Sequence, residues 1–363
     1  MMLRLMSVGE QSASTEVWKE ESSPNCTKLQ VVLSGSPKTS AVMFSAGVLG
    51  NVAALVLLEF RRRKQKHSAS LFQVLVTALV ITDLLGTFSA SPLVISAYAQ
   101  NRSMLGLSRS RAACNHFGFS MTFFSLVTLA VLLCMAVERW LAIGHPYLYE
   151  RRVSVRCGYV VLPVVYLVCA LFCLAPFLGV GFGRYVQYCP GTWCFLDLNS
   201  NSDELGHKVY KNVYASCLLL MIACTVLCNA SVIYHLLLMH RRSKAIRSSF
   251  RRTRGQRSLS ITEEVEHLVL LGFMTIAFVI CSLPLVIRVY MSSSDHAMDL
   301  TALLLLSMNP IIDPWLFIIL SPPVPRLLWE KLCKASRSRA NHKKILHKPS
   351  ETCPSNTPME LQK

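Results

Sequence analysis

The amino-acid sequence predicts an all-α membrane protein: a seven-transmembrane helix bundle followed by a short amphipathic helix. Hydrophobic residues make up 52% of the 363 residues, and charged residues make up only 16%. Soluble domains carry roughly 25% charged residues. The apolar residues also gather into seven runs, and each approaches or exceeds the roughly 20 residues that a helix needs to cross a bilayer.

The seven runs cover approximately residues 41–60, 71–97, 113–143, 157–180, 209–238, 265–291 and 299–320. Helices are expected because backbone polar groups inside a bilayer must be hydrogen-bonded within their own segment. No internal repeat relates one half of the chain to the other. A transporter built from inverted halves, or a channel, is therefore the weaker alternative.

Basic residues lie on one side of the predicted bundle. They occupy residues 61–67, Arg151 to Arg156, residues 241–257 and the C-terminal tail, and the net charge is +17. The positive-inside rule places these segments in the cytosol and the N-terminus outside a plasma membrane. Two sequons agree with this orientation, at Asn25 and Asn101. Because the charge is spread over four inner segments, nucleic-acid binding is not expected.

Three parts are expected along the chain. Residues 1–39 form an extracellular N-terminal segment, residues 40–335 form the bundle with its amphipathic helix, and residues 336–363 form a disordered cytoplasmic tail. The sequence VPRLLWEKLCKAS, residues 324–336, places leucines on one side and basic residues on the other, which is typical of an interfacial helix. Cys333 in this helix is either palmitoylated or a plain reduced cysteine.

Cysteines on the outer side predict a disulfide. Cys114 opens the third run, and Cys194 lies in the second outer loop within YCPGTWCF. An oxidising exterior allows these two to pair and to hold the loop over the mouth of the bundle. The alternative is that both are unpaired. A bridge between Cys26 and Cys189 is a weaker prediction, based on the outer cysteines that remain.

Charged and polar residues inside the runs predict a switch and a polar core. Glu138 and Arg139 lie at the inner end of the third run, where an arginine is costly unless paired or near water. Glu138 can hold Arg139 in a resting state, although simple snorkelling is the alternative. Asn51, Asp83 and Asp313 lie deep in three different runs. They predict either a shared cluster filled by water and ions or separate helix–helix hydrogen bonds.

A proline accompanies the last of these residues. Pro314 follows Asp313 and is expected to break the helix beside it, leaving a backbone group that water can satisfy.

Residue types that are absent from the runs exclude some classes of receptor. Seven spans with a basic third inner loop suggest a G-protein-coupled receptor, but the third run has no aspartate to pair with an amine ligand. The seventh has no lysine for a retinal Schiff base. No nucleophile–base set and no metal-ligand spacing is present, so neither an enzyme nor a cofactor is expected.

Several segments resemble the prostanoid receptors within the rhodopsin-like superfamily. They are MFSAGVLGN (43–51), ITDLLGT (81–87), SPLVISAYAQN (91–101), RYVQYCPGTWCF (184–195), CSLP (281–284) and IIDPWLF (311–317). The resemblance covers about residues 40–335. It departs from the general rhodopsin-like pattern at CSLP, which lacks a tryptophan, and at Asp-Pro, which replaces Asn-Pro. The cAMP-raising branch of the family couples to Gs, so the resemblance implies a lipid ligand and Gs as partners.

The resemblance also implies ligand contacts, with one exception. The implied contacts are Ser40, Met43, Tyr98, Thr192, Trp193 and Ser307, any of which could instead be ordinary packing. The family holds the prostanoid carboxylate with an arginine in the seventh span, and that position is Leu304 here.

Two readings follow from Leu304. In the first, Arg288 near the outer end of the sixth run replaces the anchor, although it could instead only snorkel to headgroups. In the second, the chain is receptor-like with weak or no prostanoid binding. Such a protein would signal constitutively or act as a partner or decoy.

Overall fold

The computed structural model describes residues 37–64, 70–108, 110–178, 183–198, 205–246, 256–291 and 296–320. Within them, seven helical spans are long and apolar enough to cross a membrane, which confirms the predicted fold class. The amphipathic segment with Cys333, the C-terminal tail, Asn25 and Cys26 lie outside the described residues.

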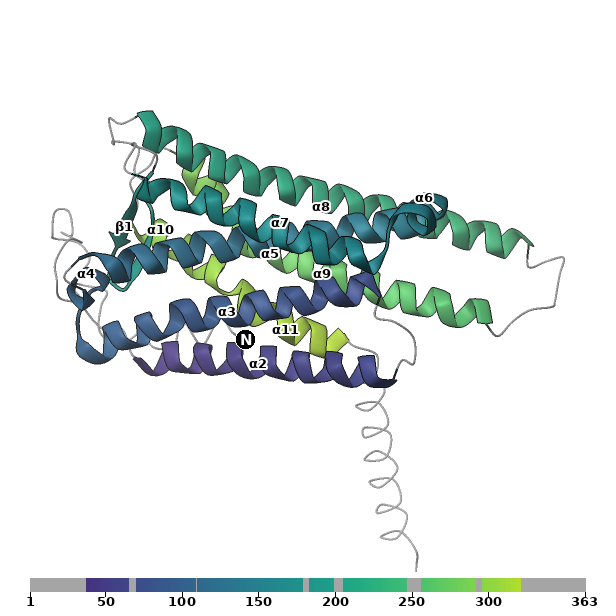
Figure 1. Ribbon diagram of the computed structural model, residues 1–363, viewed down its shortest axis with the longest axis horizontal. Coiled ribbons are helices and arrows are strands. Elements are labelled where there is room, and N and C mark those ends of the chain that lie inside the picture. The colour runs from purple at the N-terminus through teal and green to yellow at the C-terminus, as the bar shows by residue number, and fades with distance from the viewer. Residues whose placement is uncertain are drawn as a thin grey trace, which may run out of the picture. The chain divides into compact units, whose positions relative to one another are not determined.

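The spans lie side by side in Figure 1. They are α2 (Pro37–Lys64), α3 (Leu71–Gln100), α5 (Ala112–Gly144), α7 (Val155–Leu174), α8 (Leu205–Ile246), α9 (Gln256–Tyr290), and α10 (His296–Ser307) followed by α11 (Asn309–Leu320). Shorter elements connect them: α4 (Met104–Leu107), α6 (Pro146–Arg152), the 3-10 turn η2 (Ala175–Phe177), β1 (Tyr185–Tyr188) and β2 (Trp193–Leu196).

The ends of α3 show how the sequence sets a helix boundary. Ser70 caps its first turn by accepting a hydrogen bond from the backbone N–H of Gln73, and the Gln73 side chain accepts from the Ser70 N–H. This reciprocal pair satisfies two backbone donors that the helix itself cannot use. At the other end Asn101 adopts the left-handed conformation, with φ of 49°, which asparagine tolerates better than most residues.

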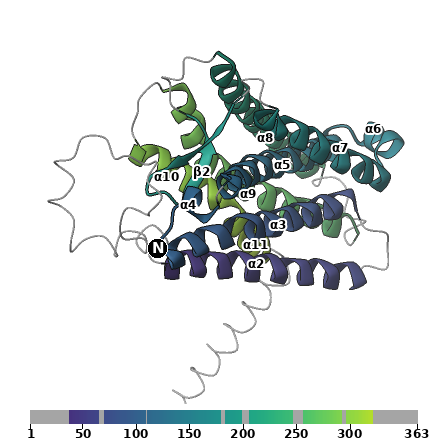
Figure 2. The same ribbon diagram turned by 60° about the vertical axis from the view of Figure 1, so that its left-hand side comes forward.

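Burial differs sharply between helices. Of the most apolar 18-residue stretch in each helix, 56% is buried in α3 and in α5, but only 6% is buried in α7. Figure 2 shows α7 beside α5 and α8, away from α2. Its exposed side chains are large and apolar, as at Val160, Leu167 and Leu171. An apolar surface of this kind is stable next to lipid, not water, so α3 and α5 are the most packed spans and α7 faces lipid.

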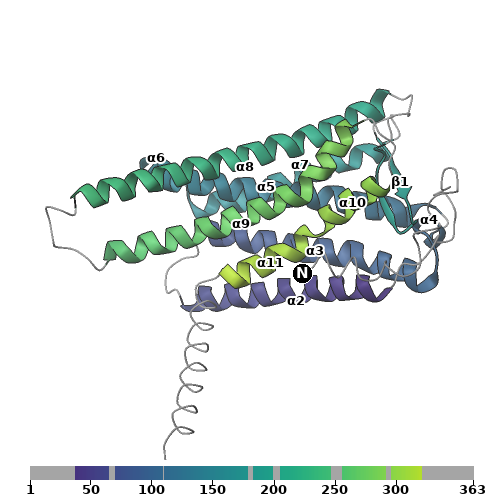
Figure 3. The same cartoon turned by 180° about the vertical axis from the view of Figure 1, so that it is seen from behind.

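The seventh span breaks at Met308, not beside Pro314 as the sequence suggested. Helix α10 ends at Ser307, and α11 begins at Asn309 (Figure 3). The Met308 N–H donates to the Leu305 carbonyl at 3.0 Å, a tighter turn than an α-helix makes. Pro310 explains the position, because it has no N–H to donate to the carbonyl of Leu306 four residues earlier, so the helical hydrogen bonds are interrupted there.

Pro314 instead lies inside α11. It has no N–H to give to the carbonyl four residues earlier, which is that of Pro310. The side-chain amide of Asn51 donates to this carbonyl at 2.9 Å. The expected free backbone group therefore exists, but a side chain from α2 satisfies it.

Candidate functional site

A two-stranded hairpin covers one end of the bundle. Strands β1 and β2 pair antiparallel, with Val186 opposite Phe195. The predicted disulfide between Cys114 and Cys194 is present and ties β2 to the first turn of α5. Gly118 of α5 allows Tyr185 of the hairpin to pack closely against this helix, because a Cβ at position 118 would lie 2.4 Å from the Tyr185 ring.

Polar contacts within the hairpin stabilise it. Arg184 and Asp197 close its open end with an ion pair of 2.7 Å. The buried Tyr188 hydroxyl donates to the Leu196 carbonyl at 2.6 Å. Burial raises the pKa of Tyr188 well above its ordinary value, so it keeps its proton and remains a donor. Cys189, at the turn, is also disulfide-bonded, and its partner lies outside the described residues.

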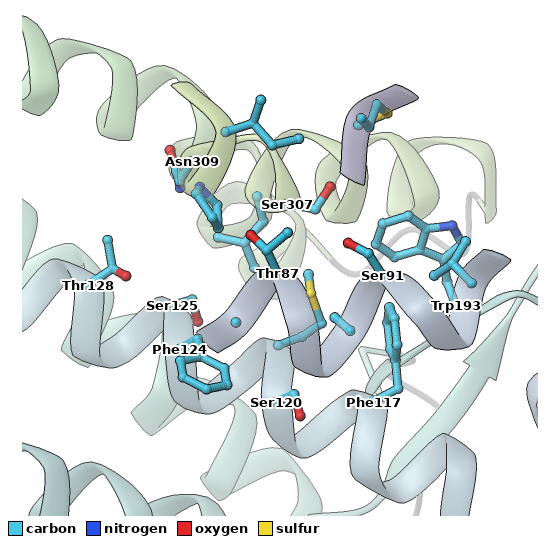
Figure 4. A pocket seen from close by; sticks show the side chains of 18 of the residues that line it. Thr87, Ser91, Phe117, Ser120, Phe124, Ser125, Thr128, Trp193, Ser307 and Asn309 are labelled. Carbon is cyan, nitrogen blue, oxygen red and sulfur yellow. The ribbon is translucent and has the colours of Figure 1, made fainter. Parts of the chain in front are cut away.

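A pocket lies beneath this hairpin (Figure 4). Its empty space, counted together with its open mouth, is about 850 Å³. Trp193 of β2 and Phe117 of α5 lie at one end, and their rings meet edge to face at 5.4 Å. The other walls come from α2, α3, α5, α9, α10 and α11.

The lining is apolar with hydroxyl groups at intervals. Hydroxyls come from Ser40, Thr87, Ser91, Ser120, Ser125, Thr128 and Ser307, and one amide comes from Asn309. No side chain with a formal charge is among the lining residues in the described part of the chain. The pocket can therefore take a largely apolar molecule and orient it by neutral hydrogen bonds.

Four of the predicted ligand contacts line this pocket: Ser40, Met43, Trp193 and Ser307. Two others do not, namely Tyr98 and Thr192. The Thr192 hydroxyl instead donates to the Tyr98 hydroxyl at 3.1 Å, which links the hairpin to the end of α3.

Leu304 is half-buried on α10 and lies one turn before Ser307, but it is not a lining residue. Its backbone carbonyl accepts the Ser307 hydroxyl proton at 2.7 Å. Residues three apart share a helix face, so a longer side chain at 304 would extend from the same face as Ser307.

Arg288 does not snorkel to headgroups. Only 4% of its side chain is exposed, and it forms an ion pair with Asp299 of α10, with Nη2 at 2.6 Å from Oδ1. Its Nε donates to the same oxygen at 2.8 Å. The prediction overlooked Asp299, whose carboxylate makes burial of this cation tolerable. Arg288 is not a lining residue of the pocket either.

The predicted polar core comes together in part. The buried carboxylate of Asp83 accepts a hydrogen bond from Thr128 at 3.1 Å, and Asp83 and Asp313 are close enough for their charges to interact. Asn51 contacts α11 through Pro310. Both Asp313 oxygens, Asp83 Oδ2 and Asn51 Oδ1 are buried and have no hydrogen-bond partner among the described residues. A shared cluster of water or ions at these oxygens stays a prediction.

The predicted switch pair is buried and joined at the other end of α5. Nη2 of Arg139 donates to Oε1 of Glu138 at 2.8 Å. Tyr149 of α6 donates to the same Glu138 oxygen at 2.7 Å, and the Arg139 guanidinium lies over the Phe72 ring at 4.7 Å. Glu138 and Arg139 are only 3% and 5% exposed. A buried side chain does not fit snorkelling to headgroups, and the role of the pair as a switch stays a prediction.

Sequence reasoning missed most of the pocket wall, although a signal was present. The α5 lining residues are Phe117, Ser120, Met121, Phe124, Ser125 and Thr128. Their spacing places them on one helix face. Such a face reads as ordinary helix packing until the facing helices are known, because small hydroxyl residues are common between membrane helices.

Comparisons with known proteins agree with this architecture. Residues 50–317 match the model of the 7 transmembrane receptor (rhodopsin family). The structure of squid rhodopsin superposes with a TM-score of 0.64 at 13% identity, covering 84% of this chain and 91% of that one. At that identity the superposition supports the fold alone.

Sequence relatives are much nearer. The rat prostaglandin E2 receptor EP2 subtype is 50% identical over 87% of this chain and 91% of that receptor. The mouse prostaglandin D2 receptor is 41% identical over 84% and 91%, and the human prostacyclin receptor is 44% identical over 81% and 75%. The segments MFSAGVLGN (43–51) and MTFFSL (121–126) also resemble the second subtype of prostaglandin E2 receptor. The chain belongs to the prostanoid receptors of the rhodopsin family.

Proposed function

We propose that the chain binds prostaglandin E2 or a related lipid from the extracellular side, couples to Gs and raises cAMP. As a member of this receptor family it is a multi-pass plasma-membrane receptor and not an enzyme. The observation that carries the proposal is the 50% identity to a prostaglandin E2 receptor, together with a largely apolar pocket beneath the hairpin. The extracellular N-terminus rests on the distribution of basic residues, and Gs rests on the resemblance to the cAMP-raising branch.

Ligand binding and G-protein coupling are joined by a change in the bundle. A ligand between the outer halves of the helices can shift the equilibrium only toward the state that it binds more tightly. In the active state the inner face opens, and Arg139 leaves Glu138 to contact the G protein. The buried ion pair therefore stabilises the resting state.

A cAMP assay tests the proposal. Cells expressing the chain are exposed to a prostanoid panel, with mock-transfected cells and the Arg139→Ala variant as controls at matched surface expression. We expect prostaglandin E2 to raise cAMP in cells with the wild-type chain and not in either control. Calcium release without any cAMP change would contradict the Gs assignment.

A second candidate function is favoured by Leu304. The family's arginine is missing at this position, and no charged side chain lines the described pocket. A receptor-like protein of this kind binds prostanoids weakly or not at all, and signals constitutively or acts as a partner or decoy. Raised basal cAMP that no prostanoid changes, at normal surface expression, would favour this function.

A further inference from the structure

The protons of the pocket hydroxyls are largely committed to the protein. The Thr87 hydroxyl donates to the Asp83 backbone carbonyl at 2.7 Å. The Thr128 hydroxyl donates to the Asp83 carboxylate at 3.1 Å. A hydroxyl has one proton and two lone pairs, so both threonines can offer a ligand only lone pairs.

Two serines in the same pocket are committed in the same way. Ser125 donates to the Thr122 carbonyl at 2.9 Å, so the Tyr214 hydroxyl, 2.8 Å away, must be the donor to Ser125. Ser307 donates to the Leu304 carbonyl at 2.7 Å. Both serines therefore act as hydrogen-bond acceptors toward a ligand.

Asn309 adds an acceptor that has no partner. Its side chain is 3% exposed and lines the pocket. Its Nδ2 donates to the Ser282 hydroxyl at 3.3 Å. Its Oδ1 is buried and has no hydrogen-bond partner within the described ranges. A buried acceptor without a partner is costly, and a donor group on a ligand would remove that cost.

Uncommitted donors also line the pocket. Ser40, Ser91 and Trp193 line it, and no partner within the described helices and hairpin takes their side-chain protons. Figure 4 shows Ser91 and Trp193 at one end, with Thr128 and Asn309 at the other. All of these donors are neutral. A carboxylate taken out of water needs far more compensation than an uncharged carbonyl does.

We infer that this pocket takes an uncharged lipid, in which the carboxylate of a prostanoid is replaced by a neutral amide or ester. Its head carbonyl accepts from Ser91 and Trp193. Its hydroxyl or N–H groups donate to the acceptors formed by Ser307, Asn309 and their neighbours. The inference rests on the proposed function, because it assumes that this pocket binds a prostanoid-like ligand.

A matched pair of ligands tests the head group. Prostaglandin E2 and its primary amide differ only in charge and donor capacity at the head. In cells expressing the full chain, we expect the amide to raise cAMP at a concentration at least tenfold lower than the acid. An acid that is as potent as the amide, or more potent, overturns the inference and leaves the proposed function intact. If neither compound acts at normal surface expression, the proposed function fails.

A serine pair tests the acceptor end. Ser307 and Ser45 both donate to a carbonyl of their own helix, but Ser45 is exposed and does not line the pocket. We expect Ser307→Ala to lower the potency of the amide about five- to tenfold, consistent with the loss of one hydrogen bond. The matched Ser45→Ala should leave it unchanged. Equal potency of the two variants would overturn the assignment of Ser307 as an acceptor.

Discussion

The ion pair between Arg288 and Asp299 should behave as a structural pair, and a double-mutant cycle can show this. Its two contacts are 2.6 and 2.8 Å, and the side chains are only 4% and 10% exposed. Removing Asp299 alone takes away the carboxylate that pairs with this buried cation, which costs about 3–5 kcal/mol, whereas replacing both partners by apolar residues costs much less. We therefore expect Asp299→Leu to be far less stable than Asp299→Leu combined with Arg288→Met.

The assay is unfolding of purified receptor in mixed micelles, with ligand-free wild type as the reference. The expected order of stability is wild type and double variant close together, with Asp299→Leu and Arg288→Met each below them. Single variants whose destabilisations add up in the double variant would refute the pairing. A cAMP potency lost in Arg288→Met but restored in the double variant would show that the arginine acts through the fold, not through ligand contact.

Three further predictions concern the bundle. Asn51→Leu removes the donor to the partly buried Pro310 carbonyl and should lower stability by about 1–3 kcal/mol in the same unfolding assay; an unchanged stability would refute the contact. Glu138→Gln weakens the ion pair with Arg139 and should raise basal cAMP. Unchanged basal cAMP at equal surface expression would count against a resting-state role for this pair. Cys194→Ala frees the hairpin from α5 and should sharply reduce surface expression and ligand response; a fully responsive variant would contradict that role.

Much of the architecture could be predicted because it follows from local properties. Apolar runs that are long enough to cross a bilayer must be helical. The structure places the spans within a few residues of the predicted ranges. Cys114 and Cys194 were expected to pair and hold the loop over the bundle, and they are bridged. In each case local composition and position along the chain were sufficient for the prediction.

The misses depended on partners that lie far away in the sequence. Arg288 was expected either to replace the carboxylate anchor or to snorkel to headgroups, because it lies near the outer end of the sixth run, but it pairs with Asp299 on α10. The break in the seventh span was assigned to the wrong proline, because a helix with Pro314 is tolerated once Asn51 satisfies the freed carbonyl. The directions of the pocket hydroxyl protons depend on which carbonyls face them, which spacing alone does not determine.

The central claim is that this prostanoid-family receptor has an apolar residue where the family holds a carboxylate. Saturation binding of radiolabelled prostaglandin E2 to membranes tests it most directly, with wild type, Leu304→Arg and the apolar control Leu304→Met. Two charge-assisted hydrogen bonds correspond to about 2–5 kcal/mol, or roughly tens- to thousands-fold in Kd. We expect weak binding by wild type and Leu304→Met, and a gain of that size for Leu304→Arg. Nanomolar binding by wild type that Leu304→Arg does not improve would contradict the claim.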